Sequence, residues 1–326
     1  MINDDLLYRV ACSYHIEKKN QREIAAQLGV SRVQVSKYLK MAASRGLVRV
    51  EVIPPSISSS DQSFFRGQFL SRFPMKQILV CPSYNSRDTL FRTLLRHSED
   101  FLFSVLGSTD MVIGLGWGRT VYELTENMRP VERSLWRVVP LAGGSNRASE
   151  KYFNTNHIVQ TFSEKLGAQS ELIYLPLISD STESRRSILQ GDEYDRISKL
   201  WSSLDVTICS VGSNLTGSPL FRYGVIGPEY LEILSRSRAV GDMLTHFYDV
   251  EGNIVEIGIE DRMINVSLAQ LRNTKNRVVI ASGSDKSSAI LGGLRAGLID
   301  ILVIDQSTAA SVLSLSEQRA DGGRPR

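Results

Sequence analysis

Short apolar runs alternate with amphipathic stretches from residue 76 onward, and this alternation constrains the fold of the chain more than any other feature. The runs have the length of buried strands, which we expect at residues 77–80, 111–115, 136–141, 172–175, 206–211, 277–281 and 301–304. Helical patterns lie between them, at residues 88–106, 120–128, 156–166, 228–235, 286–296 and 307–313. This order predicts a large α/β domain with a mainly parallel, doubly wound sheet. Ligands of such sheets bind beyond the carboxyl ends of the strands.

A second pattern, in residues 21–40, is typical of two short helices joined by a tight turn. Gly29 stands where the chain must reverse. Ser31 can cap the second helix, with Gln34 three residues later to complete a capping box. The positions that would hold the two helices together are apolar: Ile24, Ala25, Leu28, Val30 and Val35. The spacing predicts a DNA-binding helix-turn-helix. An ordinary αα-hairpin with a solvated second helix is the alternative.

Long polar side chains occupy the positions of this motif that face away from the apolar ones. The candidate DNA contacts are Gln21, Ser31, Arg32, Gln34, Ser36, Lys37, Lys40 and Arg49. Of these, Arg32, Gln34, Ser36 and Lys37 can read base edges, whereas Gln21, Lys40 and Arg49 can hold phosphates. Residues 47–52 alternate like a short strand, which predicts the winged form of the motif. Residues 1–53 carry a net charge of +4 and the whole chain only +3, so the positive charge is concentrated where phosphates would bind.

Composition and the positions of proline and serine residues indicate how the chain is divided into domains. Its 326 residues, 42% of them hydrophobic and 22% charged, are typical of a soluble protein with a substantial core. Two prolines and a run of serines predict a linker. We therefore expect an all-α helix-turn-helix domain with a short wing (residues 1–53), a linker (54–63), an α/β effector domain (64–316) and a disordered tail (317–326).

Several function classes are disfavoured by the sequence. No run reaches the roughly 18 apolar residues of a membrane span, and the first residues lack a signal-peptide pattern, so we expect a cytoplasmic protein that does not enter a membrane. The three cysteines are widely spaced, and neither they nor the four histidines show metal-ligand spacing. We expect no disulfide framework, no metal site and no cofactor.

Three strand-to-helix loops, at residues 114–120, 210–216 and 281–286, are rich in Gly, Ser and Thr. The first has the pattern G-x-G-x-G and can direct backbone N–H groups at an anion, supported by Arg119 and Thr120. Because it matches neither the dinucleotide fingerprint nor the P-loop, a plain tight turn is the alternative. Lys286 stands in the first turn of a helix, where a cation opposes the helix dipole, so we expect it to face an anionic ligand. Together the loops predict a small phosphate ester as the ligand.

These motifs resemble those of the SorC family of sugar-responsive bacterial transcriptional regulators over about residues 6–313. The matching segments are residues 114–120, 140–144, 239–242 with 247–249, and 283–286 with 294–298. The resemblance implies an effector domain similar to sugar-phosphate isomerases and glucosamine-phosphate deaminases. It implies a phosphate held by Gly116, Trp117, Gly118, Arg119, Thr120 and Lys286, sugar hydroxyls held by Asp242, and Gly143, Gly144 and Asn156 nearby. Arg238 and Gln306 depart from the family pattern, which leaves the sugar preference open.

We therefore expect a DNA-binding regulator of a carbohydrate-utilisation operon, controlled by a phosphorylated sugar or polyol. One helix-turn-helix offers few contacts, so we expect a dimer or tetramer on a repeated operator in double-stranded DNA. The alternative is a phosphosugar isomerase or deaminase with an accessory DNA-binding domain. Its general base would have to be Asp242, which is better explained as a hydroxyl acceptor. Lys286 as a Schiff-base lysine would need a lowered pKa.

Overall fold

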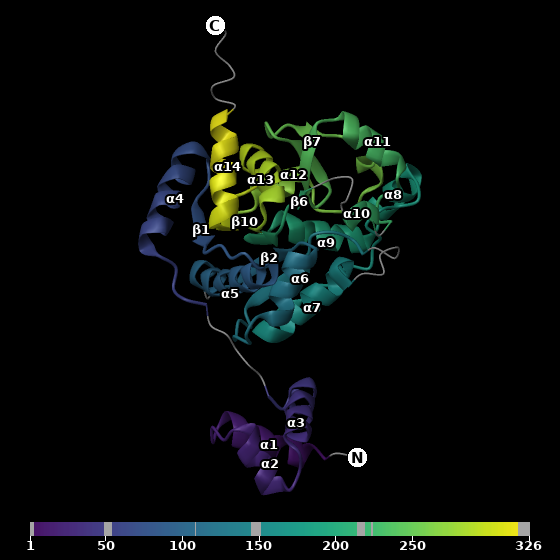
Figure 1. Ribbon diagram of the computed structural model, residues 1–326. Coiled ribbons are helices and arrows are strands. Elements are labelled where there is room, and N and C mark those ends of the chain that lie inside the picture. The colour runs from purple at the N-terminus through teal and green to yellow at the C-terminus, as the bar shows by residue number, and fades with distance from the viewer. Residues whose placement is uncertain are drawn as a thin grey trace. The chain divides into compact units, whose positions relative to one another are not determined.

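The computed structural model describes residues 3–48, 54–107, 109–144, 151–213, 219–222 and 224–318 (Figure 1). The chain divides into two compact units, Met1–Pro55 and Ser56–Arg326. Within the described ranges, no helix combines the length and the apolar character that crossing a membrane requires.

The first unit contains three helices: α1 (Asp4–His15), α2 (Gln21–Leu28) and α3 (Arg32–Ser44). Its small core is built on Val10, Ile24, Ala25 and Val35, so the predicted clamping positions are confirmed. The turn glycine is confirmed as well, because Gly29 ends α2 with a left-handed φ of 63°. Residues 49–53 lie outside the described residues. Most of the predicted wing, with Arg49, therefore remains a prediction.

The starts of both α2 and α3 are fixed by side-chain caps. The amide of Gln34 donates to the Ser31 hydroxyl over 3.1 Å, as the sequence predicts. The reciprocal bond of a capping box is found instead at the start of α2, where Glu23 accepts from the amide of Asn20 over 2.8 Å. The two helix starts are thereby held in place on either side of Gly29.

A seven-stranded sheet forms the centre of the second unit, in the order β1-β11-β10-β5-β2-β3-β4 with every neighbouring pair parallel. Its strands are β1 (Gln77–Cys81), β2 (Met111–Leu115), β3 (Trp136–Pro140), β4 (Gln169–Ser170), β5 (Val206–Cys209), β10 (Asn276–Ile280) and β11 (Ile301–Asp305). Except in the short, exposed edge strand β4, neighbouring residues of the strands enter two different hydrophobic clusters, so both faces of the sheet are buried. The predicted large α/β domain with a parallel sheet is confirmed.

Helices cover both faces of this sheet, as the two clusters and Figure 1 show. One face packs against α5 (Arg87–Val105), α6 (Arg119–Asn127) and α7 (Thr155–Leu166). The other packs against α4 (Ser59–Arg72), α9 (Asp192–Ser202), α12 (Leu268–Asn273), α13 (Ser287–Arg295) and α14 (Gln306–Gln318). Residues 59–63, predicted as linker, form the first turns of α4. The Gln62 side chain joins this helix to β1 by bonding the Ile78 carbonyl and the Val80 amide.

A strand predicted at residues 172–175 is wrong, because β4 at Gln169–Ser170 takes the edge of the sheet instead. The backbone of Ile173 is occupied by the Asn156 side chain, whose amide nitrogen donates to the Ile173 carbonyl and whose oxygen accepts from the Ile173 amide. The segment then leaves the sheet and makes an isolated bridge between Gly144 and Pro176.

A second, antiparallel sheet was not predicted. It has the order β6-β7-β8-β9, formed by β6 (Gly212–Ser213), β7 (Ala239–Met243), β8 (His246–Asp249) and β9 (Ile254–Val255). The remaining helices around it are α8 (Thr182–Leu189), α10 (Pro219–Arg222), α11 (Glu229–Arg236) and short 3-10 turns η1 (Lys151–Phe153), η3 (Glu260–Arg262) and η4 (Ser284–Lys286). A third hydrophobic cluster lies here, and Trp117 packs against both this cluster and that of the parallel sheet.

Candidate functional site

The strand order places the described parts of the three predicted loops side by side; residues 214–216 of the second loop lie outside the described residues. β10, β5 and β2 are consecutive, parallel neighbours, so their carboxyl ends share one edge of the sheet. Strands lie about 4.8 Å apart, which puts the loops after β2 and β10 about 10 Å from each other, with the loop after β5 between them. That span is comparable to the length of a phosphorylated monosaccharide.

The loop after β2 leads into α6 without a side-chain cap. Gly118 precedes the helix with a φ of 104°, a conformation that favours glycine, and among the described residues no side chain accepts from the first amides of α6. Those amides can therefore bind an anion at the positive end of the helix. Thr120 is buried there, at 8% exposure. Arg119 is exposed, and its guanidinium lies over the Phe91 ring, 4.9 Å from the centroid.

Gly116 and Trp117 hold this loop on the core. The amide of Gly116 donates to the Ile208 carbonyl over 3.0 Å, which joins the end of β2 to β5. A Cβ on Gly116 would lie 3.1 Å from Cys209 Sγ, so there is little room for a side chain. Gly116 therefore positions the loop, and the half-buried Trp117 packs against two hydrophobic clusters.

Lys286, in η4 after β10, is half-buried and close to the loop after β5. Its ammonium donates to the Val211 carbonyl over 3.0 Å and approaches the Ser210 hydroxyl at 3.4 Å. Burial lowers the pKa of Lys286, against the raising effect of Asp285 and Asp242. Among the described residues, no carboxylate lies within the 4.0 Å of an ion pair with this ammonium.

Asp242 comes from β7 of the antiparallel sheet, not from a loop of the parallel one. It is 5% exposed, and its Oδ2 accepts from the Thr245 amide over 3.1 Å. Burial raises the pKa of Asp242 to about 6, although the Thr245 amide and the charge of Lys286 act in the opposite direction. The two side chains are thus near enough for the charge of each to affect the pKa of the other, although the residues are far apart in the sequence.

Two buried hydroxyls near these residues were not singled out from the sequence. Tyr248 Oη and Ser287 Oγ have no hydrogen-bond partner among the described residues. Burial and the charge of Asp242 raise the pKa of Tyr248 well above its ordinary value. Ser287 directly follows Lys286 and begins α13, so its position next to the third loop was the available signal. The sequence contained no such signal for Tyr248, because its place beside Asp242 depends on the antiparallel sheet, which was not predicted.

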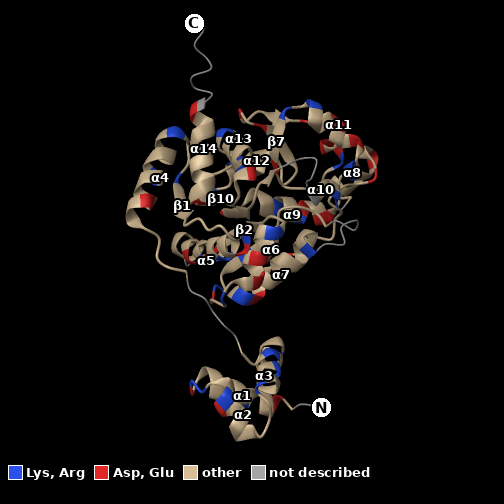
Figure 2. Ribbon diagram, viewed as in Figure 1, with Lys and Arg blue, Asp and Glu red and all other residues tan. Residues whose placement is uncertain are grey.

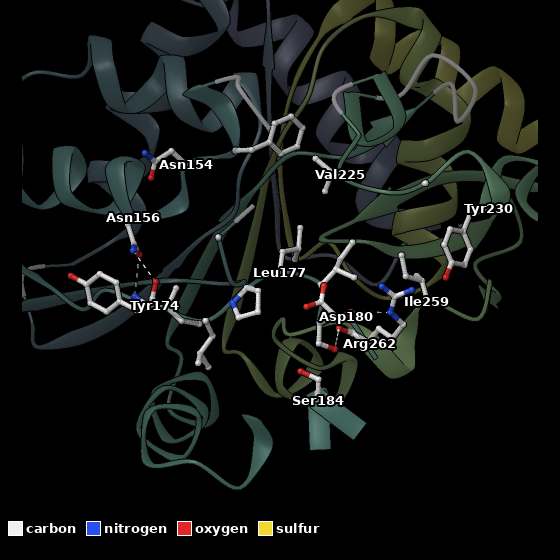
Figure 3. Close-up of a pocket in the computed structure, with 18 of the residues that line it drawn as sticks. Asn154, Asn156, Tyr174, Leu177, Asp180, Ser184, Val225, Tyr230, Ile259 and Arg262 are labelled. Atoms are coloured by element: carbon white, nitrogen blue, oxygen red, sulfur yellow. Dashed lines mark hydrogen bonds between the residues drawn. The ribbon is translucent and has the colours of Figure 1, made fainter. Parts of the chain in front are cut away.

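The remaining three predicted residues lie around a separate cavity of about 660 Å³ (Figure 3). Gly144 and Asn156 line it, but among its described lining residues there is no Thr120, Asp242 or Lys286. Asn156 uses both polar atoms of its side chain on the backbone of Ile173, as the dashed lines in Figure 3 show. Gly143 is buried and donates to the Ile264 carbonyl over 2.9 Å. These hydrogen bonds of Asn156 and Gly143 join segments of the backbone, so both residues have a structural role here.

The wall of this cavity also carries side chains that are not among the predicted site residues. Arg262 donates from Nε to the Ser179 carbonyl over 2.9 Å, while Asp180, Ser184 and Tyr230 lie along the same wall. Figure 3 shows Arg262 beside Asp180 and Ile259. The size of the cavity suits a small metabolite.

The first unit has a separate polar surface on α3, whose Lys and Arg residues are blue in Figure 2. Arg32, Lys37 and Lys40 are exposed, whereas Gln34 and Ser36 are half-buried. Gln21 is half-buried at the start of α2, and Ser31 is occupied by capping. Of the described candidates, the three cations are thus the most accessible to DNA.

Comparison with known proteins finds similarity over nearly the whole chain. Residues 62–314 match the family described as "Putative sugar-binding domain". The chain is 27% identical over 309 residues to the sorbitol operon regulator of Klebsiella pneumoniae, covering 94% of this chain and 97% of the relative. It is 28% identical over 305 residues to the deoxyribonucleoside regulator of Bacillus subtilis (strain 168), covering 92% and 95%.

The crystal structure of the full-length sorbitol operon regulator SorC from Klebsiella pneumoniae is also similar. It superimposes with a TM-score of 0.73 at 26% identity, over 96% of this chain and 99% of that one. These relatives are named as regulators and not as enzymes. The resemblance to the SorC family inferred from the sequence is therefore confirmed.

Proposed function

This chain belongs to the sugar-binding domain family found in SorC-type regulators, and we propose that it is a DNA-binding transcriptional regulator of a carbohydrate-utilisation operon. In this proposal, residues 1–53 form a winged helix-turn-helix that binds operator DNA. Residues 64–316 form an effector domain, similar in fold to sugar-phosphate isomerases, that binds a phosphorylated sugar or polyol. The named relatives lend no support to the isomerase or deaminase alternative.

The environment of Lys286 is the observation that carries the effector assignment. A half-buried ammonium without a carboxylate within ion-pair distance is costly unless an anion neutralises it. The uncapped start of α6, about 10 Å away across β5, offers amides to the same anion or to another group of the same ligand. A phosphate suits both, because it accepts several hydrogen bonds at once.

The sugar part of the ligand is assigned to Asp242. Its carboxylate uses one oxygen on the Thr245 amide, which leaves the other oxygen to accept from hydroxyl groups. Thr120 lies at the phosphate end, at the first turn of α6. Gly118 supports the phosphate through backbone geometry, because its φ of 104° shapes the turn into the helix.

Control of DNA binding follows if the effector prefers one of two conformations of the protein. A ligand shifts such an equilibrium only by the difference in its affinity for the two states. Because α3 offers few base contacts, we propose that two or four chains bind a repeated operator together.

A thermal-shift series tests the effector assignment. A panel of phosphorylated sugars and polyols should contain a ligand that raises the melting temperature of the wild-type chain, and Lys286→Met should abolish that rise. Lys199→Met is the matched control, because Lys199 is exposed near the end of α9, which leads into the amino end of β5 and not into the loops at the carboxyl ends. Equal stabilisation of wild type and Lys286→Met by the same phosphosugar would refute the phosphate assignment.

Fluorescence anisotropy with the DNA upstream of the neighbouring operon tests the regulatory assignment. We expect salt-sensitive, sequence-specific binding that changes when the stabilising phosphosugar is added. Turnover of that phosphosugar at ordinary enzymatic rates would support the enzyme alternative instead.

A further inference from the structure

The face of α3 that points away from its core contains one apolar side chain. The buried and half-buried apolar residues Val35, Tyr38, Leu39 and Ala42 define the inner face of this helix. At 100° per residue, the positions directly opposite are 33, 37, 40 and 44. Three of these are Lys37, Lys40 and Ser44, which are polar and exposed. The fourth is Val33, and it is 67% exposed.

An isolated exposed valine needs no explanation in general. The position of Val33 nevertheless calls for an explanation, because this residue lies in the first turn of α3, two residues after the capping serine Ser31. In a helix-turn-helix, the first residues of the second helix reach deepest into the major groove and contact base edges. A β-branched residue is also a mediocre helix former, so folding of α3 gains nothing from valine at an exposed position.

We propose that Val33 reads the C5-methyl group of thymine in the major groove. This inference rests on the proposed function, since it requires α3 to be the recognition helix. Thymine is the only base that presents a methyl group in that groove, and an apolar side chain can recognise it by excluding water. Lys37, one turn further along the same face, contacts a neighbouring base or phosphate and thereby places Val33 against the bases.

The proposal adds a kind of contact that the polar candidates cannot supply. Arg32 and Lys37 recognise hydrogen-bond acceptors, which guanine presents best. Val33 instead selects thymine over cytosine at one position of each half-site. The operator should therefore contain an invariant thymine beside the bases that the cations contact.

Uracil substitution tests this directly, because uracil differs from thymine only by the methyl group. The DNA probe is a duplex that the full-length chain itself enriches from a random pool. Each thymine is replaced by uracil in turn, and binding is measured by anisotropy at one fixed salt concentration. Loss of one buried methyl group should weaken wild-type binding about fourfold at one thymine of each half-site.

The variant Val33→Ala should bind the thymine and uracil duplexes equally. Ile16→Ala is the matched control: Ile16 is 73% exposed, lies outside α3, and its variant should keep the fourfold preference. Val33→Ala should also keep the wild-type salt dependence, since no charge is removed, whereas Lys40→Ala, which removes a cation assigned to a phosphate, should lower the slope by about 1.

Three outcomes would overturn the proposal. Wild-type binding that is insensitive to uracil at every thymine would do so, as would a Val33→Ala variant that still prefers thymine. A change in the oligomeric state of Val33→Ala with an intact thymine preference would make this valine part of a protein interface instead. If the wild-type chain enriches no DNA sequence at all, the proposed function itself fails, which separates that failure from the failure of the Val33 contact.

Discussion

The carboxylate of Asp242 occupies the space that a side chain on Gly212 would need. The two residues are paired across β6 and β7, and a Cβ on Gly212 would lie 2.0 Å from Asp242 Oδ1. Because this carboxylate is buried and bonded to the Thr245 amide, it cannot move aside without losing that bond. The glycine therefore keeps Asp242 in the position in which we propose that it binds sugar hydroxyls.

We expect Gly212→Ala to impair ligand binding more than folding. The added methyl group should displace the Asp242 side chain, lower the stability by about 1–3 kcal/mol, and weaken binding of the phosphosugar at least tenfold. Isothermal titration and urea unfolding measure the two effects. Gly67→Ala is the control, because a Cβ on this glycine of α4 would meet no atom within 4 Å. Unchanged affinity in Gly212→Ala would contradict the role given to Asp242.

The raised pKa of Asp242 makes the stability of the ligand-free chain depend on pH. Burial raises this pKa from 3.8 to about 6, so the folded state binds a proton more tightly than the unfolded state. Above about pH 6 the folded chain bears the full cost of the buried anion, about 3 kcal/mol. That cost falls as the pH decreases through 6 and is gone near 4. Asp242→Asn should therefore be more stable than wild type at pH 7.5, with the difference vanishing near pH 4.

Urea unfolding of both proteins between pH 4 and 7.5 checks this expectation. Ligand affinity should rise as the pH increases through 6, whereas the stability of the ligand-free chain falls, since the ionised carboxylate is the better hydroxyl acceptor. A phosphate monoester itself titrates near pH 6, so the affinity of wild type must be compared with that of Asp242→Asn at each pH. A constant stability difference across the range would mean that Asp242 has an ordinary pKa.

The long strands of the parallel sheet were predictable, because burial of both faces leaves continuous apolar runs. Helices α5, α6, α7, α13 and α14 were predicted as well, whereas α9 and α12, on one face of the sheet, were not. Met111–Leu115 was predicted to the residue, and the other long strands to within two. The helix cap at Ser31 and the left-handed Gly29 were predictable too, since both depend on local chemistry. The chain order of these elements also sufficed to place three loops at one end of the sheet.

What could not be predicted depends on contacts between distant segments. The antiparallel sheet consists of short strands, and its pairing of Gly212 with Asp242 spans residues whose order in the chain gives no indication of it. The apolar residues Leu172 and Ile173 suggested a strand, but the side chain of Asn156 takes up the backbone groups that a strand would use. A sequence pattern shows neither the pairing of distant short strands nor the competition of a side chain for backbone groups.

Two adjacent glycines predicted in the site should behave in opposite ways. A Cβ on Gly143 would lie 2.4 Å from the Pro176 carbonyl oxygen, which is backbone and cannot move away cheaply, whereas a Cβ on Gly144 would meet no atom of the described residues within 4 Å. Gly143→Ala should lower the stability by about 2–4 kcal/mol, and Gly144→Ala by less than about 1 kcal/mol. Differential scanning calorimetry measures both. Equal melting temperatures for the two variants would contradict the close packing at Gly143.

The three free cysteines should differ in reactivity. Burial raises the pKa of Cys209 to about 12, and burial together with the charge of Asp305 does the same for Cys81. The thiolate fraction of both is then about 10⁻⁴ at pH 8, while Cys12 is only half-buried. Ellman's reagent should label Cys12 first, and the other two only when the second unit opens. Urea should make all three react. Rapid labelling of Cys209 in the native chain, identified by peptide mapping, would show that the sheet edge opens readily.

Lys37 should contribute to DNA binding through both charge and position. It is exposed one turn after Val33, on the outer face of α3. We expect Lys37→Ala to weaken binding of the selected duplex by about 1–3 kcal/mol if the ammonium contacts a base, with relaxed specificity at that base. If it contacts a phosphate, the loss should be uniform across sequences and should disappear at high salt. Lys18→Ala is the control, because Lys18 is an exposed cation of the same unit outside α2 and α3. Equal losses for the two variants would mean that the positive charge of the unit, and not the surface of α3, determines its affinity for DNA.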